Sequence, residues 1–130
     1  MSELDSATVW RFFDGRPGHD NQSAGLVRSL GTRLALQLHD IPATKQGWKA
    51  FDSTRVARNI PNPTLIIGAG RRTHHLMLMA QALYGGRTVV MMRPSPSPEK
   101  FDLCLIPAHD HPALTSNILV TQGALNIIQP

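Results

Sequence analysis

The chain reads VWRFFDGRPGHDNQS over residues 9–23, an apolar run followed by a glycine-containing turn and then by a helical pattern. The apolar residues from Thr8 to Phe13 predict a β-strand, and the spacing from Asn21 to about Arg33 predicts a helix with one buried face. Asp20 or Asn21 would cap this helix, because a short side-chain oxygen accepts from the free N–H groups of the first turn. A strand, a turn and a helix start in this order favour binding of an anion or a polar ligand.

A second segment, TLIIGAGRRTHH over residues 64–75, repeats this order. Thr64 to Ile67 is continuous and apolar, which is typical of a strand inside a parallel sheet. Thr73 would cap a helix that runs to Tyr84, where Gly85 and Gly86 end it. Two such turns in one small domain indicate a functional site more strongly than either does alone.

The rest of the chain continues the alternation of strands and helices. Further strands are predicted at residues 34–41, 88–92, 103–106 and 117–120, with a weaker helix around 53–58. Such an alternation predicts an α/β domain: a doubly wound, mostly parallel, Rossmann-like sheet with helices on both faces. The 130 residues suffice for one such domain, over residues 1–130.

Composition narrows the possible functions. Thirteen Lys and Arg residues against nine Asp and Glu residues give a formal charge of +4. The basic residues are scattered along the chain, and the sequence contains no stripe of basic and aromatic residues, so nucleic-acid binding is not expected. Cys104 lies alone in an apolar run, as expected of a buried, inert thiol in a reducing compartment. The chain starts without a signal-peptide pattern and has no run long enough to span a membrane. We expect a cytoplasmic protein with at most peripheral membrane contact.

Polar residues gather just beyond the predicted strands, where a doubly wound fold binds its ligands. All six histidines and four arginines fall near this edge. His19 and Asp14 are the candidate catalytic residues, with His19 as a possible general base. The candidate ligand-binding residues are Gly15, Arg16, Gly18, Asn21, Gly68, Gly70, Arg71, Arg72, Thr73 and His109.

Each of these residues also has a structural interpretation. Gly15 and Gly18 could serve only to shape a tight turn, and Asp14 could brace it. His19 could be an ordinary solvated loop histidine. These alternatives stay open from the residues alone.

The second turn favours an anion over a dinucleotide. Gly68 and Gly70 resemble the opening of a dinucleotide fingerprint, but Thr73 stands in place of the third glycine, so no nicotinamide or flavin cofactor is expected. Arg71 and Arg72 suit a phosphate or a carboxylate. No metal is expected, because the histidines at residues 109–111 lack an obvious further ligand.

Several motifs together resemble the mitochondrial fission "elongated mitochondria" family and its bacterial relatives. They occur in the family's order and span nearly the whole chain: residues 14–23, 68–73, 101–103, 107–110 and 120–126. The resemblance implies the amino-terminal, acceptor-side domain of a GT-B type, glycosyltransferase-like architecture, with His19 facing an interdomain cleft. Because members of that family are longer, it also implies a carboxy-terminal domain beyond residue 130. This chain alone is then not expected to catalyse transfer, and an exposed interdomain face could form a homodimer.

The sequence therefore supports three functions. The first is one half of a glycosyltransferase-like enzyme that handles a sugar nucleotide, with Arg16, Arg71 and Arg72 as anion contacts. The second is a non-catalytic adaptor, as the plant branch of the family suggests, with the Pro-Ser segment at residues 93–98 as a docking strip. The third is a domain that binds a phosphorylated metabolite.

Overall fold

A computed structural model of the chain describes residues 6–91, 98–107 and 117–121. The predicted ligand residue His109 lies outside these ranges, and so does most of the Pro-Ser segment. The elements are β1 (Ser6–Phe13), α1 (Pro17–Gly31), β2 (Ala35–Pro42), α2 (Lys45–Arg55), β3 (Leu65–Ala69), α3 (Arg71–Tyr84), β4 (Arg87–Met91), a 3-10 turn (Pro98–Lys100), β5 (Leu103–Pro107) and β6 (Ile118–Thr121). None of the helices in these ranges is long and apolar enough to cross a bilayer.

The strands form one sheet in the order β2-β1-β3-β4-β5-β6, and every neighbouring pair is parallel. This arrangement confirms the predicted doubly wound α/β fold. Four of the six strand predictions are correct to within a residue at either end, whereas the first strand begins at Ser6, two residues earlier than predicted. The third strand runs on to Ala69, two residues further than predicted.

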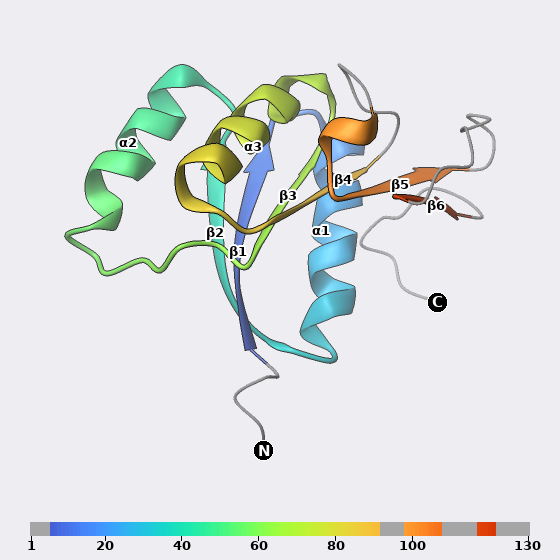
Figure 1. Cartoon of the computed structure of the whole chain (residues 1–130), viewed down its shortest axis with the longest axis horizontal. Helices are drawn as coiled ribbons and strands as arrows, with labels where there is room; N and C mark the ends of the chain where they lie inside the picture. The colour runs from blue at the N-terminus through green and yellow to red at the C-terminus, as the bar shows by residue number, and fades with distance from the viewer. Residues whose placement is uncertain (1–5, 92–97, 108–116, 122–130) are drawn as a thin grey trace.

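Helices cover both faces of the sheet, with α2 and α3 on one face and α1 on the other (Figure 1). Because successive side chains of a strand point to opposite faces, each strand supplies both cores. Trp10 and Ile66 pack under α2 and α3, whereas Val9 and Ile67 pack against α1. Cys104 is fully buried on the first of these faces, and burial raises its pKa to about 11. The interpretation of Cys104 as a buried thiol is confirmed.

The predicted helix starts at Asn21 and Thr73 are wrong, and both errors matter for the site. Helix α1 begins at Pro17, whose missing N–H is no loss in the first turn, and no side chain caps it. Helix α3 begins at Arg71, with Gly70 as its N-cap. His19, Arg71 and Arg72 are therefore first-turn helical residues and not loop residues.

Helix α2 also differs from the prediction, since it spans Lys45–Arg55 instead of residues 53–58. Thr44 caps it, and the Thr44 hydroxyl accepts a hydrogen bond of 2.9 Å from the Gly47 N–H. The first turn of α2 contains a glycine, which lowers helix propensity. Burial of Trp48 against the aromatic side chains of Trp10 and Phe51 outweighs that weakness.

Asp102, part of one of the family-like motifs, braces the sheet. Its carboxylate accepts hydrogen bonds from Gln81 Nε2 at 2.7 Å and from the Thr88 N–H at 2.9 Å. The Asp102 N–H in turn donates to Thr88 Oγ1 at 2.9 Å. These bonds join the start of β4 to the segment that leads into β5. This motif is therefore structural.

We expect Asp102→Ala to lower the free energy of unfolding by about 1–3 kcal/mol, because the Thr88 N–H and the Gln81 amide lose their acceptor. Urea denaturation followed by circular dichroism measures this change. Lys100→Ala, at an exposed position nearby, is the control and should change stability by less than about 0.5 kcal/mol. Equal stability of the two variants would contradict the bracing role.

Candidate active site

The site begins with the topology of the sheet. Strands β1 and β3 are neighbours, but α1 leaves the end of β1 on one face and α3 leaves the end of β3 on the other (Figure 1). The segments that follow β1 and β3 thus diverge at the carboxyl ends of these strands and leave a crevice between them. In open α/β sheets this switch point is where ligands bind.

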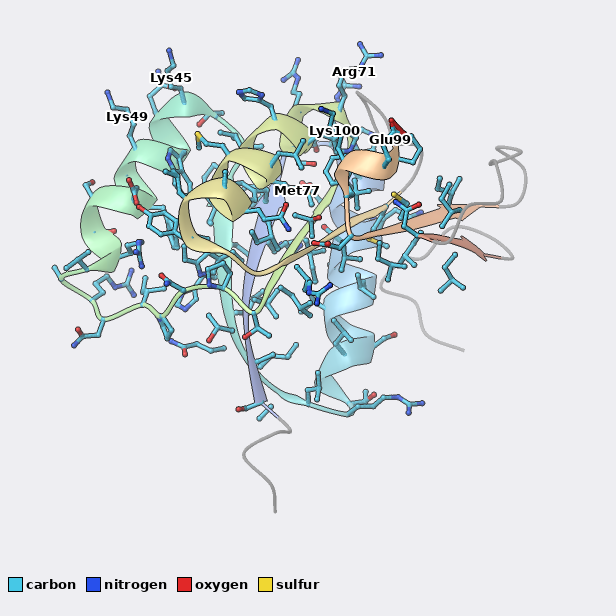
Figure 2. The ribbon with its side chains drawn as sticks, viewed as in Figure 1. Lys45, Lys49, Arg71, Met77, Glu99 and Lys100 are labelled. Carbon is cyan, nitrogen blue, oxygen red and sulfur yellow. The ribbon has the colours of Figure 1, made fainter. Side chains whose placement is uncertain are left out.

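A pocket of about 310 Å³ lies at this point, lined by Asp14, Arg16, His19, Arg71 and Arg72. The first three residues follow β1 and the last two follow β3, so the fold brings together the two turns that the sequence singles out. Figure 2 shows Arg71 projecting from the amino-terminal end of α3, at the end of the molecule toward which β1 runs.

Asp14 and His19 form a close pair inside the pocket. The distance from Asp14 Oδ2 to His19 Nδ1 is 2.7 Å, and the Arg16 N–H donates to Asp14 Oδ1 at 3.0 Å. The Asp14 side chain is only 1% exposed, whereas the His19 side chain is 23% exposed. The carboxylate is thus buried behind the imidazole, which is the group that solvent can reach.

The surroundings of Asp14 keep it ionised. Burial alone would raise the pKa of Asp14, but hydrogen bonds from His19 and from the Arg16 N–H, with favourable electrostatic interactions from both residues, outweigh that effect and lower the pKa. Because a carboxylate only accepts hydrogen bonds, a neutral His19 must carry its proton on Nδ1. Its Nε2 then keeps a lone pair, the arrangement that a histidine general base requires.

Asp20 fixes the turn between β1 and α1. Its carboxylate reaches back from the first turn of α1 and accepts from the Asp14 N–H at 3.3 Å and from the Gly15 N–H at 3.1 Å. Gly15 has a φ of +84°, a conformation that glycine adopts without strain. One of the two side chains that were expected to cap α1 therefore orders the turn that holds Asp14.

Arg11, which the sequence reasoning missed, holds the start of α1 against the sheet. Its guanidinium donates to Ser23 Oγ at 2.9 Å, to the Asp20 carbonyl oxygen at 3.0 Å and to Asp40 Oδ1 at 2.9 Å. One side chain of β1 thus ties the first turns of α1 to β2. The sequence did indicate this role, because a charged residue such as Arg11 inside an apolar strand needs polar or charged partners.

Gly70 joins the two halves of the site. It is buried at the end of β3 with φ +98° and ψ 149°, a region that is essentially restricted to glycine. A Cβ at this position would lie 2.6 Å from Asp14 Oδ2 and closer still to His19 Nδ1. The Asp14–His19 pair therefore packs directly on the backbone of the turn between β3 and α3.

The other predicted ligand residues within the described ranges do not line the pocket. Gly68 is inside β3, where a Cβ would lie 2.6 Å from Met77 Sδ, and the Thr73 hydroxyl is buried and donates to the Gly70 carbonyl oxygen at 2.7 Å. Packing of α3 on β3 accounts for both residues. Gly15, Gly18 and Asn21 are exposed around the start of α1.

The described histidines do not all share one site, contrary to the expected rim. His19 lines the pocket, but His74 is buried against Phe101, with 5.3 Å between ring centroids. The ring of His39 packs near Phe51 of α2, and burial followed by the charge of Arg58 lowers its pKa, whereas Asp40 acts in the opposite direction. Strand and helix ends place residues near an edge, but side-chain direction decides which of them meet.

The fold and the pocket together define a Rossmann-like α/β domain with a candidate site at its switch point. A family model described as mitochondrial fission ELM1 matches residues 17–130 of the chain. The chain therefore belongs to the mitochondrial fission ELM1 family, as its motifs indicated. No curated protein and no solved structure matches it significantly.

We expect Gly70→Ala to destabilise the protein by at least about 1–3 kcal/mol, the cost of the backbone conformation alone, and to push His19 away from Asp14. Gly18→Ala is the matched control, because a Cβ there meets nothing within 4 Å and its φ is not positive. It should be neutral or stabilising by up to about 1 kcal/mol. Thermal and urea unfolding measure both changes, and similar values for the two variants would contradict the packing assigned to Gly70.

Proposed function

We propose that this chain is the acceptor-side domain of a GT-B type, glycosyltransferase-like protein, and that His19 is its general base. Three observations support the proposal: the membership of the mitochondrial fission ELM1 family, the parallel Rossmann-like sheet, and a histidine oriented by a carboxylate at the switch point. The third carries most weight, because it concerns chemistry and not only fold.

The chemistry is the transfer of a sugar from a sugar nucleotide to a hydroxyl group. His19 Nε2 takes the proton of the acceptor hydroxyl while its oxygen forms a bond to the anomeric carbon of the donor. The bond from that carbon to the diphosphate oxygen breaks, and the nucleoside diphosphate leaves with the electron pair. The imidazolium that forms is stabilised by the Asp14 carboxylate at Nδ1, as in other histidine–aspartate pairs. In a GT-B architecture a carboxy-terminal domain binds most of the donor.

A protein-interaction adaptor is the competing function. An adaptor has no need of a carboxylate that is 1% exposed and holds a histidine at 2.7 Å. The Pro-Ser segment that would favour docking lies mostly outside the described residues. The geometry of the pocket thus favours the enzyme.

We expect His19→Ala in the full-length protein to lower kcat for sugar transfer by about 10²–10⁴-fold, the usual contribution of a general base. Binding of the sugar nucleotide should change little, because His19 acts on the acceptor. Release of UDP or GDP from UDP- and GDP-sugars measures turnover, and calorimetric titration with the same sugar nucleotides measures donor binding.

His75→Ala is the matched control, since His75 is exposed on α3 and does not line the pocket. It should leave turnover within about twofold of the unmodified protein. Undiminished turnover in His19→Ala would remove His19 from the mechanism. If the full-length protein bound neither UDP- nor GDP-sugars, the enzyme would be excluded and the adaptor favoured.

A further inference from the structure

We infer that the acceptor molecule carries a phosphate-type dianion, which Arg16, Arg71 and Arg72 bind beside His19. The inference deepens the proposed function and rests on it for the statement that the bound molecule is the sugar acceptor. The anion site itself can be tested without any transfer reaction.

The ion pairs of the arginines are the first argument. Arg11 pairs with Asp40 at 2.9 Å, Arg55 with Asp52 at 3.6 Å and Arg87 with Asp102 at 4.0 Å. No such ion pair joins the three pocket arginines to a carboxylate in the part of the chain that the structure describes, and the same holds for the exposed Arg28, Arg33 and Arg58. The pocket arginines differ from these three in lying together. They line one pocket from two separate turns. The three residues are exposed, so solvent screens part of their mutual repulsion, and an anion bound between them would offset the rest.

The charge of the pocket is the second argument. Its lining residues are three arginines, one ionised aspartate and one histidine, so the net charge is +2 when His19 is neutral. The Asp14 carboxylate already accepts from His19 and from the Arg16 N–H. Among the described residues it forms an ion pair with His19 and none with Arg71 or Arg72. A ligand group with two negative charges, such as a phosphomonoester or a diphosphate, matches this excess.

The amino-terminal ends of α1 and α3 differ, and this difference indicates on which side of the pocket the anion binds. In α1 an acidic residue, Asp20, stands in the first turn and its carboxylate accepts from two N–H groups before the helix. The first turn of α3 contains no acidic residue, and no side chain caps it. The positive end of α3 adds to the charge of Arg71 and Arg72. We therefore place the phosphate on the α3 side, with Arg16 facing it from the α1 side.

This placement also defines the class of acceptor. The phosphate would lie beside α3, and His19 would meet a hydroxyl of the same molecule on the α1 side. An acceptor with these two features is a phosphorylated polyol or sugar with a free hydroxyl near its phosphate. Such a compound exists both as a free metabolite and as the headgroup of a phospholipid.

Titration of the chain with inorganic phosphate, followed by ¹H–¹⁵N NMR, tests the anion site. We expect saturable shifts at the amides of Gly70–Arg72 and Gly18–His19. The double variant Arg71→Ala/Arg72→Ala should weaken binding by at least about tenfold, because two charge-assisted hydrogen bonds are lost. Arg28→Ala/Arg33→Ala removes the same charge from exposed positions at the other end of α1 and should change the Kd by less than twofold.

Equal weakening by the two double variants would show that only the overall charge attracts phosphate, and this would overturn the inference. Shifts spread over the whole surface would overturn it as well. Glycerol 3-phosphate and phosphatidylcholine vesicles that contain phosphatidic acid then compare free with lipid-borne phosphomonoesters. Binding of either that depends on Arg71 and Arg72 supports the inference, and binding of neither overturns it.

His19→Gln separates this inference from the proposed function. It should leave the Kd for phosphate within about twofold and lower sugar transfer by the full-length protein by about 10²–10⁴-fold. Site-specific phosphate binding without any transfer in the unmodified full-length protein would refute the general base and leave the anion site standing. Transfer that is insensitive to Arg71→Ala/Arg72→Ala would refute the anion site and leave the general base standing.

Discussion

The site depends on the contact between the backbone of Gly70 and the Asp14–His19 pair. A glycine at this position has two consequences: β3 can turn into α3 with a positive φ, and a buried carboxylate can approach the turn closely. Any side chain on Gly70 would occupy the space of the carboxylate and the imidazole. The absence of a Cβ thus brings the turn after β1 and the turn after β3 into one pocket.

Polar contacts around this point position His19 without help from a ligand. Asp20 orders the turn, Arg11 holds the start of α1 to β1 and β2, and Asp14 orients the imidazole through Nδ1. Each buried polar group in this chain of contacts has a partner, as low-dielectric surroundings require. A pre-ordered histidine next to an excess of positive charge is suited to a substrate that carries both a hydroxyl and an anion. The proposed transfer chemistry and the inferred phosphate follow from these two properties.

The fold was predictable from the sequence because buried parallel strands correspond to short apolar runs in the sequence, and glycine-containing turns separate these runs. The exact helix starts were not predictable in this way. Asp20 resembles an N-cap, but Pro17 starts the helix earlier, and the carboxylate of Asp20 turns back to Asp14 and Gly15. Thr73 also resembles a cap, but Gly70 begins α3, and the Thr73 hydroxyl closes its first turn. The pairing of Asp14 with His19 and the role of Arg11 depend on side-chain direction in three dimensions, which residue spacing does not determine.

The most direct test of the account is the distance between Gly70 and His19 in solution. A nuclear Overhauser experiment on the ¹⁵N,¹³C-labelled chain measures it, because the Cβ position of Gly70 lies 2.8 Å from His19 Cε1. The account predicts a strong cross-peak between a Gly70 Hα and His19 Hε1. An assigned spectrum in which Gly70 contacts other residues and shows no cross-peak to His19 would contradict it, because the two turns would then not share a pocket.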